Sequence, residues 1–151
     1  MQDRHLFHGK RLDNGEWIKG SLLRTEPLMK RGKQIHNGET LICKKAEIKG
    51  CGYCVQEHWT DSCDTGGIAV DPATIGQCTG ELDNQGILIY EHDILGDEDG
   101  GTCVVVWNAK RCCWGIKFAK SDFICHLEGV HVVKGVKIIG NIHDNPEMLK
   151  T

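Results

Sequence analysis

Short runs of residues with a two-residue alternation constrain the fold of this chain most. Residues 16–23 (EWIKGSLL) and 114–120 (WGIKFAK) alternate apolar and polar side chains, which is typical of half-buried β-strands. Residues 102–108 (TCVVVWN) are almost wholly apolar, which indicates a central strand. Further strands are expected at 39–48 (ETLICKKAEI), where the lysines favour a sheet edge, at 86–95 (GILIYEHDIL) and at 136–144 (VKIIGNIHD).

The segments between these runs carry turn signals and few helix signals. Residues 82–86 (LDNQG) predict a tight turn and residues 110–113 (KRCC) predict a hairpin end. Asn145 before Pro146 predicts a short C-terminal helix, and Ser121 is placed to cap a second short helix over 121–129. The pattern indicates a mainly β protein, α+β at most, built as a small barrel or sandwich of antiparallel strands.

Length and composition predict the organisation of the chain and its surroundings. A chain of 151 residues is expected to form one domain, with residues 24–67 as an elaborated insertion of irregular pattern. No apolar run reaches the roughly 20 residues of a membrane-spanning helix, and the N-terminal residues lack a secretory signal. We therefore expect a cytoplasmic protein with reduced thiols, and the odd count of nine cysteines disfavours a closed disulfide framework.

Charge is distributed unevenly along the chain. Residues 1–50 carry 11 Lys and Arg against 6 Asp and Glu, whereas residues 51–101 carry none against 11. This leaves no basic stripe for a nucleic-acid backbone, so nucleic acid is not the expected partner. An acidic solvated surface, or one that imitates nucleic acid, fits the middle segment.

Four cysteines within the insertion raise the question of metal binding. Cys51 and Cys54 form a C-x-x-C with glycines on both sides of Cys51, which is a half-site for tetrahedral zinc. Cys43 and Cys63 would complete one structural zinc site, with His58 or His36 as substitutes. Free reduced thiols and a redox pair are the alternatives, and the redox reading lacks a βαβ context.

Other residues are candidates for binding a ligand or partner. Gln77 and Thr79 alternate with Cys78, so on a strand they would share a face and line a pocket, or else satisfy loop backbone groups. Glu91 and Asp93 could converge on a cation or form a solvated turn. Trp59 lies among polar residues and is a candidate contact for a protein partner. Trp17 and Trp107 lie in strand-like runs and are expected in the core.

Four segments carry a resemblance to a known family. They are residues 7–22 (FHGKRLDNGEWIKGSL), 70–95 (VDPATIGQCTGELDNQGILIYEHDIL), 103–108 (CVVVWN) and 137–149 (KIIGNIHDNPEML). In this order and spacing they resemble the YopX family of phage and prophage proteins, which implies a single YopX-like domain with an SH3-like barrel portion. The chain departs from the family pattern at His92, where a glycine is common, and at Glu81. If that glycine needs a positive φ angle, His92 is strained.

The resemblance and the residues together predict a function. No nucleophile elbow, zinc-protease, P-loop or dinucleotide motif is present, so we expect no enzyme. We expect a phage-encoded binding protein, a homo-oligomer in the bacterial cytoplasm, that captures a host defence or regulatory protein or a small nucleotide signal. Tyr90 and Asp93 join Gln77, Thr79 and Trp59 as its candidate binding residues. A zinc-stabilised nucleic-acid module and an unrecognised small hydrolase are the alternatives.

Overall fold

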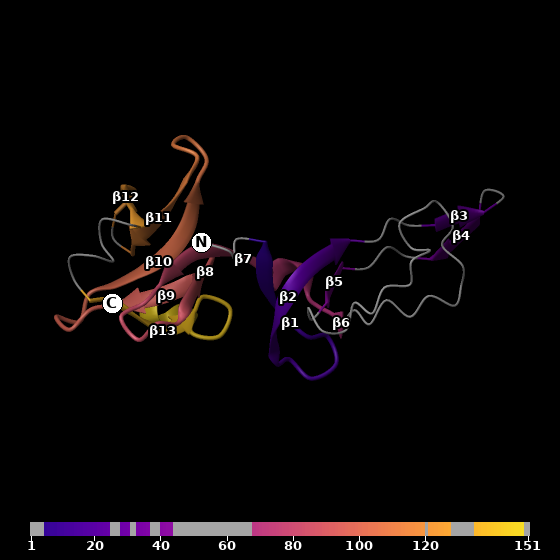
Figure 1. Ribbon diagram of the computed structural model, residues 1–151, viewed down its shortest axis with the longest axis horizontal. Coiled ribbons are helices and arrows are strands. Elements are labelled where there is room, and N and C mark those ends of the chain that lie inside the picture. Colours follow the sequence, from indigo (N-terminus) through magenta and orange to yellow (C-terminus); the bar gives the residue numbers. More distant parts are fainter. Residues whose placement is uncertain are drawn as a thin grey trace. The chain divides into compact units, whose positions relative to one another are not determined.

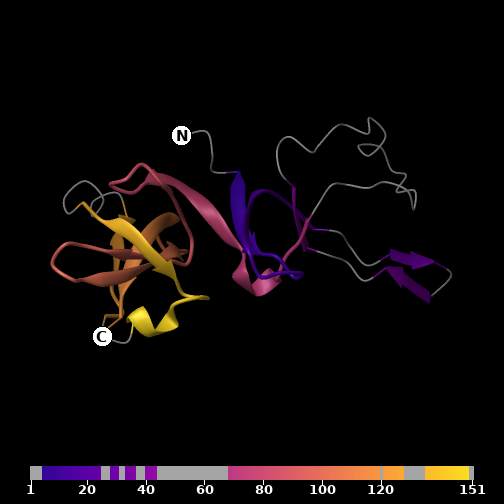
Figure 2. The ribbon, with the colours of Figure 1, turned by 90° about the horizontal axis from the view of Figure 1, so that it is seen from below.

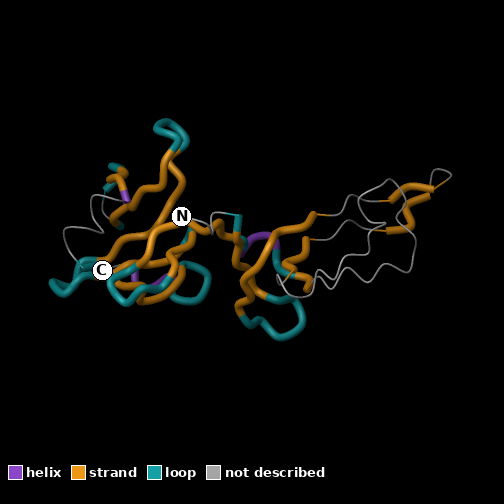
Figure 3. The backbone as a smooth tube through the Cα atoms, viewed as in Figure 1, coloured by secondary structure: helices purple, strands orange, loops and turns teal. Residues whose placement is uncertain are grey.

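The chain forms two compact units in the computed structural model. The structure describes residues 5–24, 28–30, 33–36, 40–43, 68–119, 121–127 and 135–149. The N-terminal unit spans Leu6–Ile75, and the C-terminal unit combines Met1–His5 with Gly76–Thr151. Strands dominate both units (Figures 1 and 3). The expectation of one domain over the whole chain stays a prediction, because the division into two compact units does not test it.

The N-terminal unit is built on an antiparallel sheet. Its strands are β1 (Leu6–Lys10), β2 (Trp17–Arg24), β5 (Thr40–Cys43) and β6 (Ile68–Ala69), in the order β6-β5-β2-β1. A separate hairpin joins β3 (Leu28–Lys30) to β4 (Lys33–His36), and a 3-10 helix, η1, covers Pro72–Thr74. Asp71 caps this helix, since its carboxylate accepts a hydrogen bond from the Ala73 N–H at 3.0 Å.

A small apolar cluster holds the N-terminal unit together. Ile18, Ile42 and Val70 are buried, and Phe7 and Leu22 pack against them. These residues come from four segments that are far apart in the sequence. The strand at Thr40–Cys43 was expected at a sheet edge, but it pairs with β2 on one side and β6 on the other, so that expectation was wrong.

The C-terminal unit contains a five-stranded antiparallel sheet and a hairpin. The sheet order is β12-β11-β10-β9-β13, with β9 at Asp93–Gly96, β10 at Thr102–Asn108, β11 at Cys113–Phe118, β12 at Ile124–His126 and β13 at Lys137–Asn141. The hairpin pairs β7 (Gly76–Leu82) with β8 (Leu88–Tyr90). A short 3-10 helix, η2 (Pro146–Leu149), follows β13, as Figure 2 shows.

The core of the C-terminal unit forms on one face of its sheet. Val105 of β10 lies directly opposite Ile116 of β11, and both are fully buried. Leu95 and Ile89 join them from neighbouring strands. Because side chains alternate across a strand, this register assigns every second residue of β10 and β11 to the core face.

The mainly β prediction is confirmed, and two details of it need correction. The described strands form open antiparallel sheets and no closed barrel. The helix expected over 121–129 was wrong for residues 121–126, because Ile124–His126 pairs with β11 as β12, whereas residues 128–129 lie outside the described residues. Gly115 permits this pairing, since a Cβ there would lie 2.6 Å from the Cys125 carbonyl oxygen. The turn at 82–86, the hairpin end at 110–113 and the C-terminal helix from Pro146 are confirmed.

Much of residues 24–67 lies outside the described residues, apart from β3, β4, β5 and Arg24. Among the described residues, no helix has the length and apolar character needed to cross a bilayer.

Candidate functional site

The two family-like segments around Tyr90 and Asn141 meet at one end of the sheet. Strand β9 begins at Asp93 and strand β13 ends at Asn141, and these two residues are direct partners in the antiparallel register. A β-bulge between Ile138 and Gly140 shifts the register just before this point. The sequence motifs 88–95 and 137–145 therefore form one structural site.

A buried carboxylate organises this site. Asp93 is 6% exposed, and its two carboxylate oxygens accept separate hydrogen bonds. Oδ2 accepts the Tyr90 backbone N–H at 2.8 Å, and Oδ1 accepts the Asn141 side-chain amide at 3.1 Å. The Asn141 Oδ1 in turn accepts the His143 backbone N–H at 3.1 Å. We call these four residues the Asp93 network.

The turn after β13 continues the Asp93 network. The backbone N–H groups of Asp144 and Asn145 donate to the Asn141 carbonyl oxygen at 3.0 and 2.8 Å. Gly140 admits the Asn145 side chain, because a Cβ at position 140 would lie 2.6 Å from Asn145 Oδ1. Asn141 and Asn145 thus act as turn residues, as their sequence pattern indicated.

The ring of His143, a member of the Asp93 network, contacts the ring of a second histidine, His92. His92 has a φ angle of +73°, which lies in the left-handed region that glycine adopts more readily. Its ring packs edge-on against the ring of His143, with centroids 5.1 Å apart and planes at 86°. His92 Nδ1 lies 3.4 Å from His143 Nε2. Both side chains are half-buried.

Gln77 and Thr79 both lie on β7 and differ in burial and in their hydrogen bonds. Thr79 is fully buried, its hydroxyl donates to the Ile89 carbonyl oxygen at 2.8 Å and it accepts the Glu81 N–H at 3.1 Å. Gln77 is half-buried, and its carbonyl oxygen accepts the Glu91 N–H at 2.9 Å. The hydroxyl of Thr79 therefore serves the β7–β8 hairpin, which favours the structural alternative for this residue.

The hairpin of β10 and β11 presents an aromatic surface. Trp107 and Trp114 are direct cross-strand partners, with ring centroids 5.0 Å apart and planes at 71°. Trp114 packs against the core of the C-terminal unit, whereas Trp107 is 46% exposed. Trp107 was expected in the core, and that expectation was wrong, because the buried part of the sheet ends at Val105.

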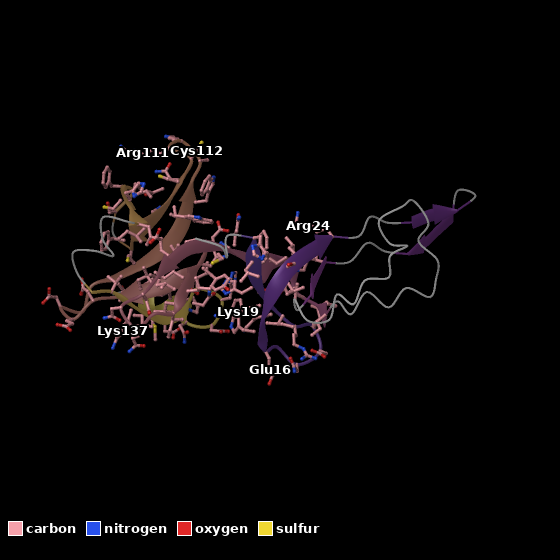
Figure 4. The ribbon with its side chains drawn as sticks, in the orientation of Figure 1. Glu16, Lys19, Arg24, Arg111, Cys112 and Lys137 are labelled. Carbon is pink, nitrogen blue, oxygen red and sulfur yellow. The ribbon has the colours of Figure 1, made fainter. Side chains whose placement is uncertain are left out.

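Two cations lie at the tip of this hairpin. Lys110 and Arg111 are exposed, and the Asn108 side chain fixes the turn by accepting their backbone N–H groups at 3.2 and 3.3 Å. Cys112 follows with a φ angle of +51°. Figures 1 and 4 show the tip, with Arg111 and Cys112, extending away from the other strands of this unit. We call Trp107, Lys110 and Arg111 the Trp107 hairpin.

The remaining predicted site residues are the four cysteines of the zinc hypothesis and Trp59. Cys51, Cys54, Cys63 and Trp59 lie outside the described residues, and Cys43 is described only as the last residue of β5. The structural zinc site therefore stays a prediction. Within the described ranges, no group of three or more His, Cys, Asp or Glu side chains is arranged to hold a metal ion.

Fold and motifs together define a class of small, antiparallel β protein in which two distant sequence segments share one buried polar network. A family model described as YopX protein matches residues 13–150, which is nearly the whole chain. The chain therefore belongs to the YopX family. A search of curated proteins finds no match to it.

Sequence reasoning missed two features of this region. The bond between Asn141 and Asp93 and the contact between His143 and His92 were not predicted, because the partners lie about 50 residues apart in the chain. The signal that was available is the HD dipeptide, which occurs both at 92–93 and at 143–144.

Proposed function

We propose that this YopX protein is a phage- or prophage-encoded, non-enzymatic binding protein that captures a host molecule through the Trp107 hairpin. The observation that carries the proposal is the 46% exposure of Trp107 on an ordered strand. An exposed Trp is costly to keep in water and is enriched among the residues that dominate binding energy. Arg is enriched in the same way, and Arg111 lies at the tip of the same hairpin.

The Asp93 network supports a binding protein rather than an enzyme. Its carboxylate holds two internal hydrogen bonds, and its amide joins β9 to the turn after β13. The two carboxylate oxygens of Asp93 accept hydrogen bonds that stabilise the fold. A general base would need such an oxygen to accept a proton from a substrate. The family motifs therefore explain the architecture, and we assign capture of the host molecule to the exposed hairpin.

The proposed target is a host defence or regulatory protein, or a small nucleotide signal, in the cytoplasm of an infected bacterium. A homo-oligomer is part of the proposal, since β12 and β13 end the five-stranded sheet and β6 ends the N-terminal sheet in the described chain. Strands at sheet ends offer backbone groups to a second copy.

One observation favours a nucleic-acid-associated module as a second candidate. An exposed Trp beside two cations is the combination that holds single strands, through base stacking and phosphate attraction. Residues 51–101 count against it, because they contain 11 acidic and no basic side chains.

The experiment compares three purified proteins by native mass spectrometry and by affinity capture from bacterial lysate. The proteins are the unaltered chain, Trp107→Ala, and Phe123→Ala as a matched control, since Phe123 is an aromatic residue of the same unit that is 63% exposed. We expect one host protein or one small phosphorylated molecule to be retained by the unaltered chain and by Phe123→Ala, and lost from Trp107→Ala. Equal retention by all three proteins contradicts the proposal. Salt-dependent binding of single-stranded oligonucleotides that Trp107→Ala removes would establish the second candidate instead.

A further inference from the structure

Two imidazole nitrogens from distant parts of the chain face each other in the C-terminal unit. His92 Nδ1 and His143 Nε2 are 3.4 Å apart, whereas the ring centroids are 5.1 Å apart. The two nitrogens therefore lie on the ring edges that are turned toward each other. Imidazole nitrogen is a preferred ligand of Zn²⁺, Cu²⁺ and Ni²⁺.

The separation of the two nitrogens matches a metal site. Zinc binds histidine nitrogen at about 2.0–2.1 Å in a tetrahedron, so two such ligands lie about 3.3–3.4 Å apart. Rotation about the last side-chain bond of histidine is soft, so small ring movements would direct both lone pairs at one ion. The geometry points to a two-histidine site in which His92 Nδ1 and His143 Nε2 bind one divalent transition-metal ion, with water in the open positions.

The backbone holds both histidines in place before any ion arrives. The His92 N–H donates to the Val105 carbonyl oxygen at 3.0 Å, and the His92 carbonyl oxygen accepts the Ile142 N–H at 3.1 Å. The second bond ties His92 to the residue that precedes His143. The His143 N–H is fixed separately by Asn141 Oδ1 at 3.1 Å. A site on fixed backbone loses little conformational freedom when it binds its ion.

The φ angle of His92 is a second, independent observation. At +73° it lies in the left-handed region, where a side chain is disfavoured and glycine is not. Local strain of this kind is found at functional sites, where the side chain has a use that offsets it. Carboxylates flank both rings in the sequence, at Glu91 and Asp93 and at Asp144, and add negative charge that favours a cation.

Binding of the ion requires one covalent change at most, in which a ring proton moves from one nitrogen to the other nitrogen of the same imidazole. In each neutral imidazole one ring nitrogen carries a hydrogen and the other has a lone pair, so the tautomer decides which of the two facing nitrogens is a donor. Metal binding needs a lone pair on both. A neutral ring that carries its hydrogen on the facing nitrogen therefore shifts to its other tautomer, in which the hydrogen lies on the nitrogen that faces away.

The test is a Co²⁺ titration of the full-length protein, followed by absorption spectroscopy and calorimetry. Thiolate ligands give cobalt intense near-ultraviolet charge-transfer bands, whereas imidazole and water do not, so cysteine-bound cobalt is counted separately. We expect one Co²⁺ equivalent without thiolate bands. Removal of either ring should weaken this equivalent by about 10–100-fold or more, since even outer partners of a metal ligand have effects of that size.

Three variants make the titration decisive. His143→Ala removes one ligand, and His92→Gly removes the other while supplying the residue that prefers the positive φ angle, so its melting temperature should not fall. His126→Ala is the matched control, since it removes an exposed histidine of the same unit. Loss of the thiolate-free equivalent in the first two variants and its retention in the control support the site. Equal binding by all four proteins, or binding with thiolate bands alone, overturns it.

Discussion

Exchanging the two partners of the Asp93 network should destabilise the protein in one step and restore it in the next. Asp93→Asn places two amide nitrogens opposite each other, in place of the 3.1 Å bond from Asn141 Nδ2 to Asp93 Oδ1. Asn141→Asp instead places two carboxylates opposite each other. Each single change breaks a charge-assisted bond in a buried site, which costs about 2–3 kcal/mol of unfolding free energy.

The double exchange regains every hydrogen bond described above for these two side chains. The asparagine introduced at position 93 would accept the Tyr90 N–H through its oxygen and donate through its nitrogen to the aspartate introduced at position 141. The second oxygen of that aspartate would accept the His143 N–H. We therefore expect the double variant to lie within about 1 kcal/mol of the unaltered protein. The two single losses together amount to about 4–6 kcal/mol, so the resulting interaction energy is about 3–6 kcal/mol, at or above the upper end of the range for contacting residues.

Urea unfolding followed by Trp fluorescence measures the stabilities of these variants, provided that the fluorescence comes from the C-terminal unit. Replacing Trp17 and Trp59 by Phe leaves Trp107 and Trp114, which belong to the same unit as Asp93. Additive losses in the double variant would refute the direct bond between Asp93 and Asn141. The Asn141→Asp variant adds a sign test, because protonation of one carboxylate relieves the repulsion, so its deficit should shrink as the pH falls.

Two substitutions and the chemistry of one buried cysteine test the packing of the C-terminal unit. Gly115→Ala should cost about 1–3 kcal/mol in the same urea assay, because its Cβ would lie 2.6 Å from the Cys125 carbonyl oxygen. Burial raises the pKa of the Cys103 thiol to about 11, so peptide mapping after alkylation near neutral pH should find exposed Cys112 modified well before Cys103. Since the ordinary thiol value is 9.0, the contribution of Cys103 to stability should fall as the pH rises from there through about 11. Asp83→Ala removes the acceptor of three backbone N–H groups and should speed hydrogen exchange in the β7–β8 turn.

Local signals in the sequence predicted the strands and turns that depend on neighbouring residues. Residues 102–108 form the central strand β10, and Asp83 closes the 82–86 turn by accepting the backbone N–H groups of Gln85 and Ile87. In each case the deciding interaction lies within a few residues of the signal.

Features that depend on distant partners were out of reach of the same reasoning. The bond between Asp93 and Asn141 spans 48 residues, and no periodicity selects that pair. The helix expected near Ser121 gives way to β12, because Gly115 on the neighbouring strand leaves room for a pairing partner. The strand-like run around Trp107 predicted a core position for it, but such a run carries no information on where along a strand the core ends.

The Asp93 network and the histidine pair have different roles at this site. Asp93 and Asn141 have polar atoms engaged in joining β9 to β13, so these two residues stabilise the fold of this chain. His92 has a φ angle that glycine adopts more readily, and its ring nitrogen lies 3.4 Å from that of His143. The proposed metal site would give this strained side chain a use that the bond between Asp93 and Asn141 does not require.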